Sequence, residues 1–253
     1  MTSVSNAAVG AYLAGNAAAK ARHGMNEAIA RLSTGVRAMY GGDAGGASAA
    51  MQIRADGKSA AIAARNIEDG ISFLQAGESL LLELAALNTR LRELRVQDLN
   101  ADTLSAGDEA AIAAEEDAVL AAGNLIDKAK FNGADLLGGT LAITYDHDGA
   151  MTTLSSDATI TLADTSIAVI DATTTDIQEA LGEMAAGMSA LKGHQAANYA
   201  LAANFEAAAS RIADTDFARS SANLAKFSIL NQSAMAMVSQ ANQAQAAVLA
   251  VLQ

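Results

Sequence analysis

The sequence lacks cysteine and proline and has few aromatic residues. Without cysteine it can form neither a disulfide framework nor a thiolate metal site. Without proline, no residue interrupts a long helix by removing a backbone donor. Hydrophobic residues make up 51% of the 253 positions, but only 4% of positions are aromatic and much of the remainder is alanine. This mixture favours long, closely packed helices over a thick globular core.

The chain is acidic, with a net charge of −12 and a pI near 4.5. A protein that binds nucleic acid usually shows a basic footprint, and an anionic membrane surface attracts basic segments. The charge balance therefore argues against both kinds of partner. The length allows one or two domains.

Both ends of the chain are free of charged side chains. All 44 Asp, Glu, Lys and Arg residues lie between Lys20 and Lys226. The end beyond Lys226 does not resemble a membrane span, because amide and hydroxyl side chains interrupt its apolar residues. The N-terminus lacks the basic region, apolar block and cleavage site of a signal peptide. We therefore expect each end to be a helix that buries one face against other helices.

Apolar and small residues recur in the C-terminal stretch at alternating spacings of three and four. This spacing predicts a helix that associates with other helices. The alternative is an ordinary core helix of a monomer, but an uncharged outer face meets solvent poorly. The stripe consists of Leu224, Phe227, Asn231, Ala234, Val238, Ala241, Gln245, Val248 and Leu252, widened by Leu230, Met237, Ala244 and Val251.

Periodicity elsewhere predicts two helical blocks around a short insert. In the first block a helical pattern runs from Met25 to Met39 and is broken by five glycines within residues 35–46. It resumes as one long helix from about residue 45 to 100, and Gly107 begins the pattern of a further helix towards Lys130.

The insert is expected to contain β structure. Residues 141–154 have β-forming residues on both sides of Asp148-Gly149, which predicts a hairpin with its turn there. Alternation continues over residues 157–169, so three or four short strands fit between about 138 and 170. Helical periodicity then runs from Ile177 to Phe205, and DTDF at 214–217 offers capping carboxylates before a terminal helix.

No constellation of residues indicates an enzyme, a cofactor or a metal site. The three histidines are far apart in sequence and none lies in an HExxH motif. Asp146 and Asp148 match part of a calcium loop, but the glycine comes too early and no bidentate Glu follows. Turn chemistry explains these two aspartates better.

Several motifs resemble the conserved terminal regions of bacterial flagellins. The resemblance covers residues 2–137 and 176–253, in the order found in that family. ARLSTGVR (30–37), NIEDGISFLQAGESLL (66–81), LRELRVQ (91–97) and FNGADLL (131–137) are similar to the N-terminal region, and SRIADTDFA (210–218) and ILNQSAMAMVSQANQ (229–243) to the C-terminal region.

The resemblance implies a structural subunit that self-assembles into the helical flagellar filament used for motility. It implies an extracellular location reached without a cleaved signal peptide. The partners it implies are further copies of the chain, a flagellar export chaperone, and cap and junction proteins, with no nucleic acid and no membrane. Two alternatives stay open: a hook–filament junction protein, or a binding module on a flagellin-like scaffold with its site in residues 138–175.

The implied fold class is mainly α, a long helical rod or coiled-coil bundle formed by the N- and C-terminal segments, with a small β-hairpin region. Residues 1–40 and 211–253 would form an inner terminal coiled-coil domain. Residues 41–137 and 176–210 would form a helical rod domain, and residues 138–175 a short β-hairpin insert.

The resemblance also identifies candidate interface residues. In some flagellins the segment matching TRLRELRVQ is recognised by Toll-like receptor 5, and Arg90, Arg92, Glu93 and Leu94 are the candidates here for a receptor-like or protofilament contact. Arg95 replaces the usual small residue, which predicts weak receptor recognition. The candidate self-assembly interface is Val9, Tyr12, Leu13, Leu224, Phe227, Leu230, Met237, Val238, Val248 and Leu252.

Overall fold

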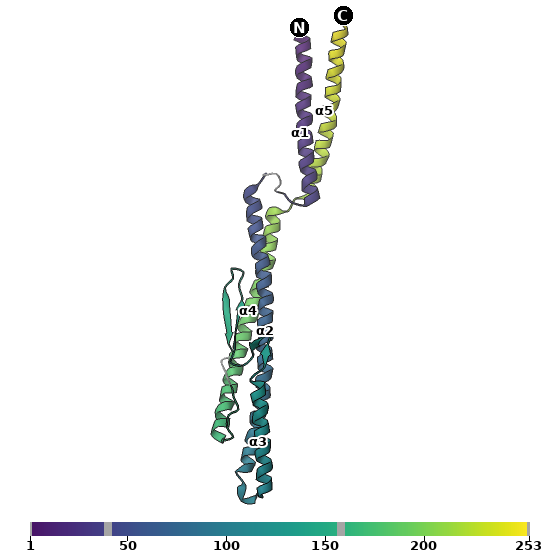
Figure 1. The fold of residues 1–253 in the computed structure, drawn as a ribbon. Coiled ribbons are helices and arrows are strands. Elements are labelled where there is room, and N and C mark those ends of the chain that lie inside the picture. The colour runs from purple at the N-terminus through teal and green to yellow at the C-terminus, as the bar shows by residue number, and fades with distance from the viewer. Residues whose placement is uncertain (1, 38–41, 156–159, 252–253) are drawn as a thin grey trace. The chain divides into compact units, whose positions relative to one another are not determined.

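The computed structural model describes residues 2–37, 42–155 and 160–251, mostly as long helices (Figure 1). This confirms the mainly α fold class with a small β component. The chain divides into two compact units: unit 1, residues 1–54 with 206–253, and unit 2, residues 55–205. The elements in chain order are α1 (Thr2–Thr34), α2 (Ala44–Asp98), the 3-10 turn η1 (Ala101–Thr103), α3 (Ala106–Ile126), β1 (Lys130–Phe131), β2 (Ala134–Asp135), β3 (Thr140–Thr144), β4 (Met151–Ser155), α4 (Ile167–Ala213) and α5 (Phe217–Val251).

The predicted long helix is confirmed as α2, whose 55 residues span about 80 Å at about 1.5 Å per residue. The predicted break before it is also present. Helix α1 ends at Thr34, five residues before the periodicity does, because Gly35 adopts a left-handed conformation (φ 72°) and its N–H closes the last turn on the Arg31 carbonyl at 2.9 Å. Asp43 then caps α2 by accepting a bond from the Gly46 N–H at 2.8 Å.

Two short hairpins follow α3. Helix α3 begins with a capping box in which Ser105 and Asp108 bond each other's backbone N–H. The hairpin β1–β2 turns at Asn132-Gly133, with φ 50° and 87°. Asn-Gly is a strong signal for such a turn, although the periodicity predicted no strand there.

The second hairpin, β3–β4, confirms the prediction, with Leu141 paired to Leu154 and Gly149 at φ 86° in the turn. The expected third and fourth strands over residues 157–169 are wrong for the part that the structure describes. Residues 160–166 form no strand there, and α4 already begins at Ile167. The alternation instead places Ile160 and Leu162 in the core of unit 2.

Unit 2 holds a core of large apolar side chains from α2, α4 and the hairpins. Gly70 of α2 allows β3–β4 to approach closely, because a Cβ there would lie 2.6 Å from Ile143 Cδ1 and 3.1 Å from Leu154 Cδ1. A smaller cluster of Leu91, Leu94, Val119 and Ile170 packs α2, α3 and α4 together. The main core includes Ile67, Phe73, Leu74, Leu81, Leu84, Leu136, Ile143, Leu154, Ile177, Met184 and Leu191.

The predicted joint at DTDF is confirmed in unit 1. Helix α4 ends at Ala213, whose carbonyl accepts the Arg37 N–H at 2.7 Å, and the Thr215 N–H bonds the Gly35 carbonyl at 2.8 Å. Asp216 then caps α5 by accepting the Arg219 N–H at 3.0 Å. The two chain breaks of unit 1 are thus bonded to each other.

One helix, α2, contains a window long and apolar enough to cross a membrane by length and composition. Only 33% of that window is buried within the fold. The core helix of a soluble protein passes the same test, so the window by itself assigns no membrane.

Candidate self-assembly surface

The pair formed by α1 and α5 joins the two ends of the chain. The helices run antiparallel, and both termini lie at the same end of the pair (Figure 1). Alanines 18, 21, 28 and 234 are buried along the pair. At its closest approach Gly24 meets the ring of Phe227, where a Cβ would lie only 2.6 Å from the ring carbons. Small residues on α1 therefore set how closely α5 packs.

The core of unit 1 is thin. Every fully buried hydrophobic residue of its described part is an alanine, whereas the largest fully buried side chains, such as Phe73 and Met184, all lie in unit 2. An alanine contributes little apolar area compared with a leucine or phenylalanine. The α1–α5 pair therefore gains little of the burial that stabilises an isolated fold. The buried alanines of unit 1 are Ala18, Ala21, Ala28, Ala50, Ala209, Ala213 and Ala234.

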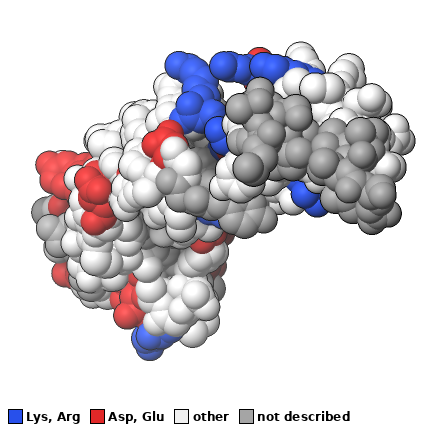
Figure 2. All heavy atoms as spheres, turned by 90° about the horizontal axis from the view of Figure 1, so that it is seen from above, with Lys and Arg blue, Asp and Glu red and all other residues white. Residues whose placement is uncertain are grey.

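Large apolar side chains of the same two helices face solvent. Among the predicted interface residues, Val9, Tyr12, Leu13, Leu230 and Met237 are between 45% and 73% exposed. Figure 2 shows one face of the molecule on which uncharged residues cover most of the described surface. Large apolar side chains exposed together on two paired helices are typical of an interaction site.

The remaining predicted interface residues are either half-buried or outside the described part of the chain. Leu224, Phe227 and Val238 are half-buried, so part of each side chain already packs within the chain. The side chain of Val248 and the whole of Leu252 lie outside the described residues. Four further exposed residues were not among the predicted interface residues: Ile29, Phe217, Ile229 and Met235. Ile229 and Met235 lie off the three-four spacing of α5, whereas Ile29 belongs to α1 and Phe217 lies one seven-residue repeat before Leu224.

The second predicted segment lies where α2 meets α3. Arg90 binds Glu115 through Nε at 2.8 Å and a terminal nitrogen at 2.6 Å, and also binds Glu93 at 2.9 Å. These hydrogen bonds, to Glu115 first, raise the pKa of Arg90. Arg92 and Glu93 are at the surface, but Leu94 is only 1% exposed and belongs to the core. Leu94 therefore supports this segment from inside.

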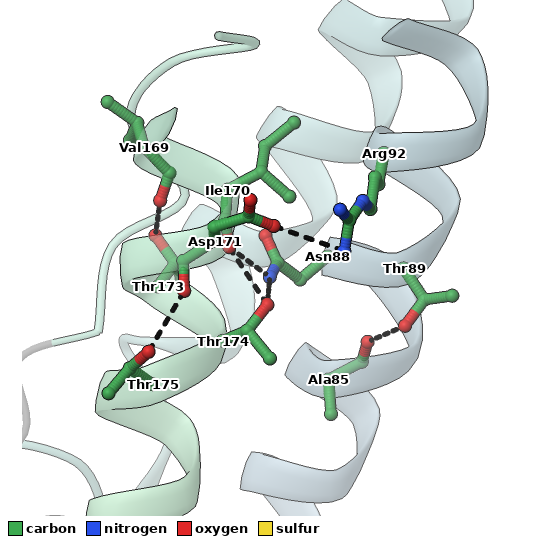
Figure 3. Close-up of polar contacts among 10 residues, drawn as sticks. All are labelled: Ala85, Asn88, Thr89, Arg92, Val169, Ile170, Asp171, Thr173, Thr174 and Thr175. Atoms are coloured by element: carbon green, nitrogen blue, oxygen red, sulfur yellow. Dashed lines mark hydrogen bonds and ion pairs between the residues drawn. The ribbon is translucent and has the colours of Figure 1, made fainter. Parts of the chain in front are cut away.

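Asn88 ties α2 to the start of α4 within unit 2 (Figure 3). Its side chain is buried, and Nδ2 donates to the Ile170 carbonyl at 3.0 Å and to Thr174 Oγ1 at 2.9 Å. One turn away, Arg92 and Asp171 form an ion pair at 3.1 Å. A single buried polar residue among apolar ones fixes the register of packed helices. Sequence periodicity did not single out Asn88.

The β3–β4 turn carries the one group of potential metal ligands in the described chain. Ligand atoms of Asp146, His147 and Asp148 lie within 4.8 Å of one another. His147 Nδ1 already bonds Asp146 Oδ1 at 2.7 Å, which raises the pKa of His147 and lowers that of Asp146. Asn198 of α4 holds the turn by donating to the Tyr145 carbonyl at 2.7 Å. The group is an imidazole hydrogen-bonded to Asp146, with Asp148 Oδ1 at 3.6 Å from Nε2, in a docked turn.

Comparison with known proteins accounts for both helical blocks. Residues 6–142 match the model of the bacterial flagellin N-terminal helical region, and residues 167–252 match that of the C-terminal helical region. The chain belongs to the bacterial flagellin family. This is a family of structural proteins. The first matched region begins within α1 and ends within β3 of this flagellin, and the second contains α4 and α5.

Relatives match along nearly their whole length. A protein named flagellin from Halalkalibacterium halodurans is 33% identical over 248 residues, covering 89% of this chain and 91% of the relative. Flagellin FlaB2 of Treponema pallidum is 30% identical, and the match covers 88% of this chain and 91% of the relative. A flagellin from Bacillus subtilis is 28% identical, and the match covers 84% of this chain and 88% of the relative. This flagellin is therefore similar in size to several relatives.

Proposed function

We propose that this chain is a filament subunit whose α1 and α5 surfaces are buried between copies of itself. The observation that carries this proposal is the contrast within the described part of unit 1, where the buried hydrophobic residues are all alanines and large apolar side chains remain exposed. Relatives named flagellin and flagellar filament core protein support the same role. Assembly gives these side chains the burial that a single copy does not.

Burial of these side chains favours assembly. Full burial of a large apolar side chain contributes about 1.5–3 kcal/mol. Nine such residues of α1 and α5 are roughly half exposed, so covering what remains offers about 8–15 kcal/mol per copy before the cost of association is subtracted. They are Val9, Tyr12, Leu13, Ile29, Phe217, Ile229, Leu230, Met235 and Met237.

We assign two roles to the predicted interface residues. Phe227 and its half-buried neighbours Leu224 and Val238 hold α5 against α1 within a copy, whereas Leu230 and Met237 contact other copies. A shallow hollow on α5 receives side chains of a neighbouring copy; it is lined by Met235, Val238, Ser239, Asn242, Gln243 and Ala246.

The inner layer of the filament in this proposal is formed by residues 1–40 and 211–253. Residues 41–137 and 176–210 form the surrounding rod, and 138–175 the insert. Isolated helices with so little buried area are marginal in water, which supports ordering of the ends on assembly.

The segment at Arg90 is proposed as a lateral contact. Within one copy Arg90 pairs with Glu93 and Glu115, and Arg92 pairs with Asp171. A neighbouring copy therefore contacts Arg92 and Glu93 as exposed members of ion pairs rather than as free charges. The same occupation supports weak recognition by Toll-like receptor 5; strong receptor signalling at low doses of purified monomer would contradict this.

The location is the extracellular filament of the flagellum, as for its family. Export without a cleaved signal peptide, an export chaperone, and cap and junction proteins are proposed from the family resemblance. Co-purification of the chain with a chaperone from its own cells tests the first of these partners.

Seeded polymerisation observed by electron microscopy tests the proposal. The full chain should elongate short filament seeds, and a truncation lacking residues 227–253 should not. Met237→Gln should raise the concentration needed for elongation, whereas Met151→Gln, on the β3–β4 hairpin and equally exposed at 64%, should leave it unchanged. A full chain that stays monomeric, with the tail protected from protease, would refute the proposal.

A further inference from the structure

One face of α5 carries positive charge without a partner in the described chain. Arg219 and Lys226 are seven residues apart, which places them on the same side of the helix. Both are exposed, and neither side chain takes part in an ion pair among the described residues. Beyond Lys226 the helix has no charged residue.

The acidic residues of unit 1 are already engaged. Its sequence holds eight Lys and Arg against five Asp and Glu, a net charge of +3. Asp216 caps α5. The other four form ion pairs: Glu27 with Arg31, Asp43 with Arg37, and Glu206 and Asp214 with Arg54. Unit 1 therefore leaves no acidic group for Arg219 and Lys226.

Unit 2 has the opposite balance, with eight Lys and Arg against 23 Asp and Glu, a net charge of −15. On α4, Asp176, Glu179 and Glu183 follow one another at spacings of three and four and are all exposed. No Lys or Arg occurs on α4 before Lys192. Like charges at these spacings weaken a helix by itself, so this acidic stripe gains from a basic partner.

The two charged faces match in length. Seven residues of helix rise about 10 Å, which is the span both from Arg219 to Lys226 and from Asp176 to Glu183. We propose that the basic face of α5 docks against the acidic stripe of α4 in a second copy of this chain. This interaction rests on the proposed function and specifies which surfaces of neighbouring subunits meet.

The opposite net charges of the units favour a second copy over other partners. A nucleic acid or an anionic membrane gains nothing from unit 2, with its net charge of −15, whereas a second copy offers that acidic unit as a partner. Salt screens charges beyond about 8 Å at physiological ionic strength. At that ionic strength the pairing therefore acts at docking distance. At low salt, where the screening length is about 30 Å, it also steers the approach of a subunit to the filament end.

Charge exchange between the two faces tests the docking. We expect R219E/K226E, and separately D176K/E179K/E183K, to elongate wild-type seeds about tenfold more slowly at low salt, the lower end of what electrostatic steering contributes to association. A chain carrying all five substitutions should elongate its own seeds at close to the wild-type rate. The matched control K128E/K192E changes the net charge as much as R219E/K226E, at exposed lysines of unit 2, and should leave the rate unchanged.

Circular dichroism first establishes that each variant keeps its helices. Recovery of the elongation rate in the variant with all five substitutions supports the docking. Two outcomes would overturn the docking while filaments still form. In one, the variant with all five substitutions elongates no faster than the variants with two or three. In the other, R219E/K226E elongates no more slowly than the control K128E/K192E. A wild-type chain that forms no filaments refutes the proposed function itself, and the docking with it.

Discussion

Substitution of Gly24 by alanine tests the packing of α1 on α5. An alanine in a helix interior is favoured over glycine by about 1 kcal/mol. At Gly10 and Gly15 nothing lies within 4 Å of the added Cβ, so G10A and G15A should stabilise α1 by that amount. At Gly24 the Cβ would lie 2.6 Å from Phe227 ring carbons, where ordinary contact begins near 3.4 Å. The helices must separate or the ring must turn out.

Such overpacking costs about 1–3 kcal/mol, and all three variants gain the same helix preference, so G24A should be less stable than the two controls by about 1–3 kcal/mol. Thermal unfolding followed by circular dichroism, with amide hydrogen exchange in α1 and α5, measures the difference. F227L should remove most of the penalty when combined with G24A, because the smaller side chain leaves room for the methyl group. If G24A proved as stable as G10A and G15A, the close Gly24–Phe227 contact would not determine the pairing.

Three further predictions concern unit 2. N88D should lower the free energy of unfolding by about 3 kcal/mol, because a carboxylate facing the Ile170 carbonyl cannot donate; urea unfolding should show partial recovery in mild acid, where a protonated Asp can donate again. G70A should be less stable than G193A by about 1–3 kcal/mol, because both gain helix preference but only the Cβ at 70 meets side chains closer than 3.4 Å; equal melting temperatures would contradict this. The hairpin turn should be most stable between pH 3.8 and 6.5. The pKa of His147 is raised, so its stabilisation is complete below pH 6.5 and is lost as pH rises through the raised pKa. The pKa of Asp146 is lowered, so its stabilisation is present above pH 3.8 and is lost as pH falls through the lowered pKa. Melting temperatures across pH, with H147Q removing the alkaline loss, measure this.

Local signals in the sequence predicted most of the fold. The long periodicity before residue 100 is α2, the Asp148-Gly149 turn is the bend of β3–β4, and DTDF is the joint before α5. Each of these signals is a property of neighbouring residues: helical spacing, a glycine at positive φ, or a capping carboxylate. Such features are specified before any tertiary contact forms.

Alternation of apolar and polar residues predicted a strand wrongly where side chains are buried but the backbone forms no sheet hydrogen bonds. Ile160 and Leu162 alternate with polar residues as in a strand, and both are buried. Their backbone forms no strand within the described residues 160–166, because the alternation records only which side chains face the core. A strand also needs a partner backbone at the right distance, and that depends on the whole fold.

The sequence by itself determined that the ends of this protein are uncharged helices of the flagellin type. The three-four stripe contains Phe227 and its widening position contains Met237, and the sequence assigns no different role to them. Only the tertiary structure decided that Phe227 packs on Gly24 while Met237 stays 64% exposed. The same holds for Leu94, which is buried four residues after the exposed Arg90. Spacing fixes the side of a helix on which a residue lies, but burial depends on which other segment covers that side.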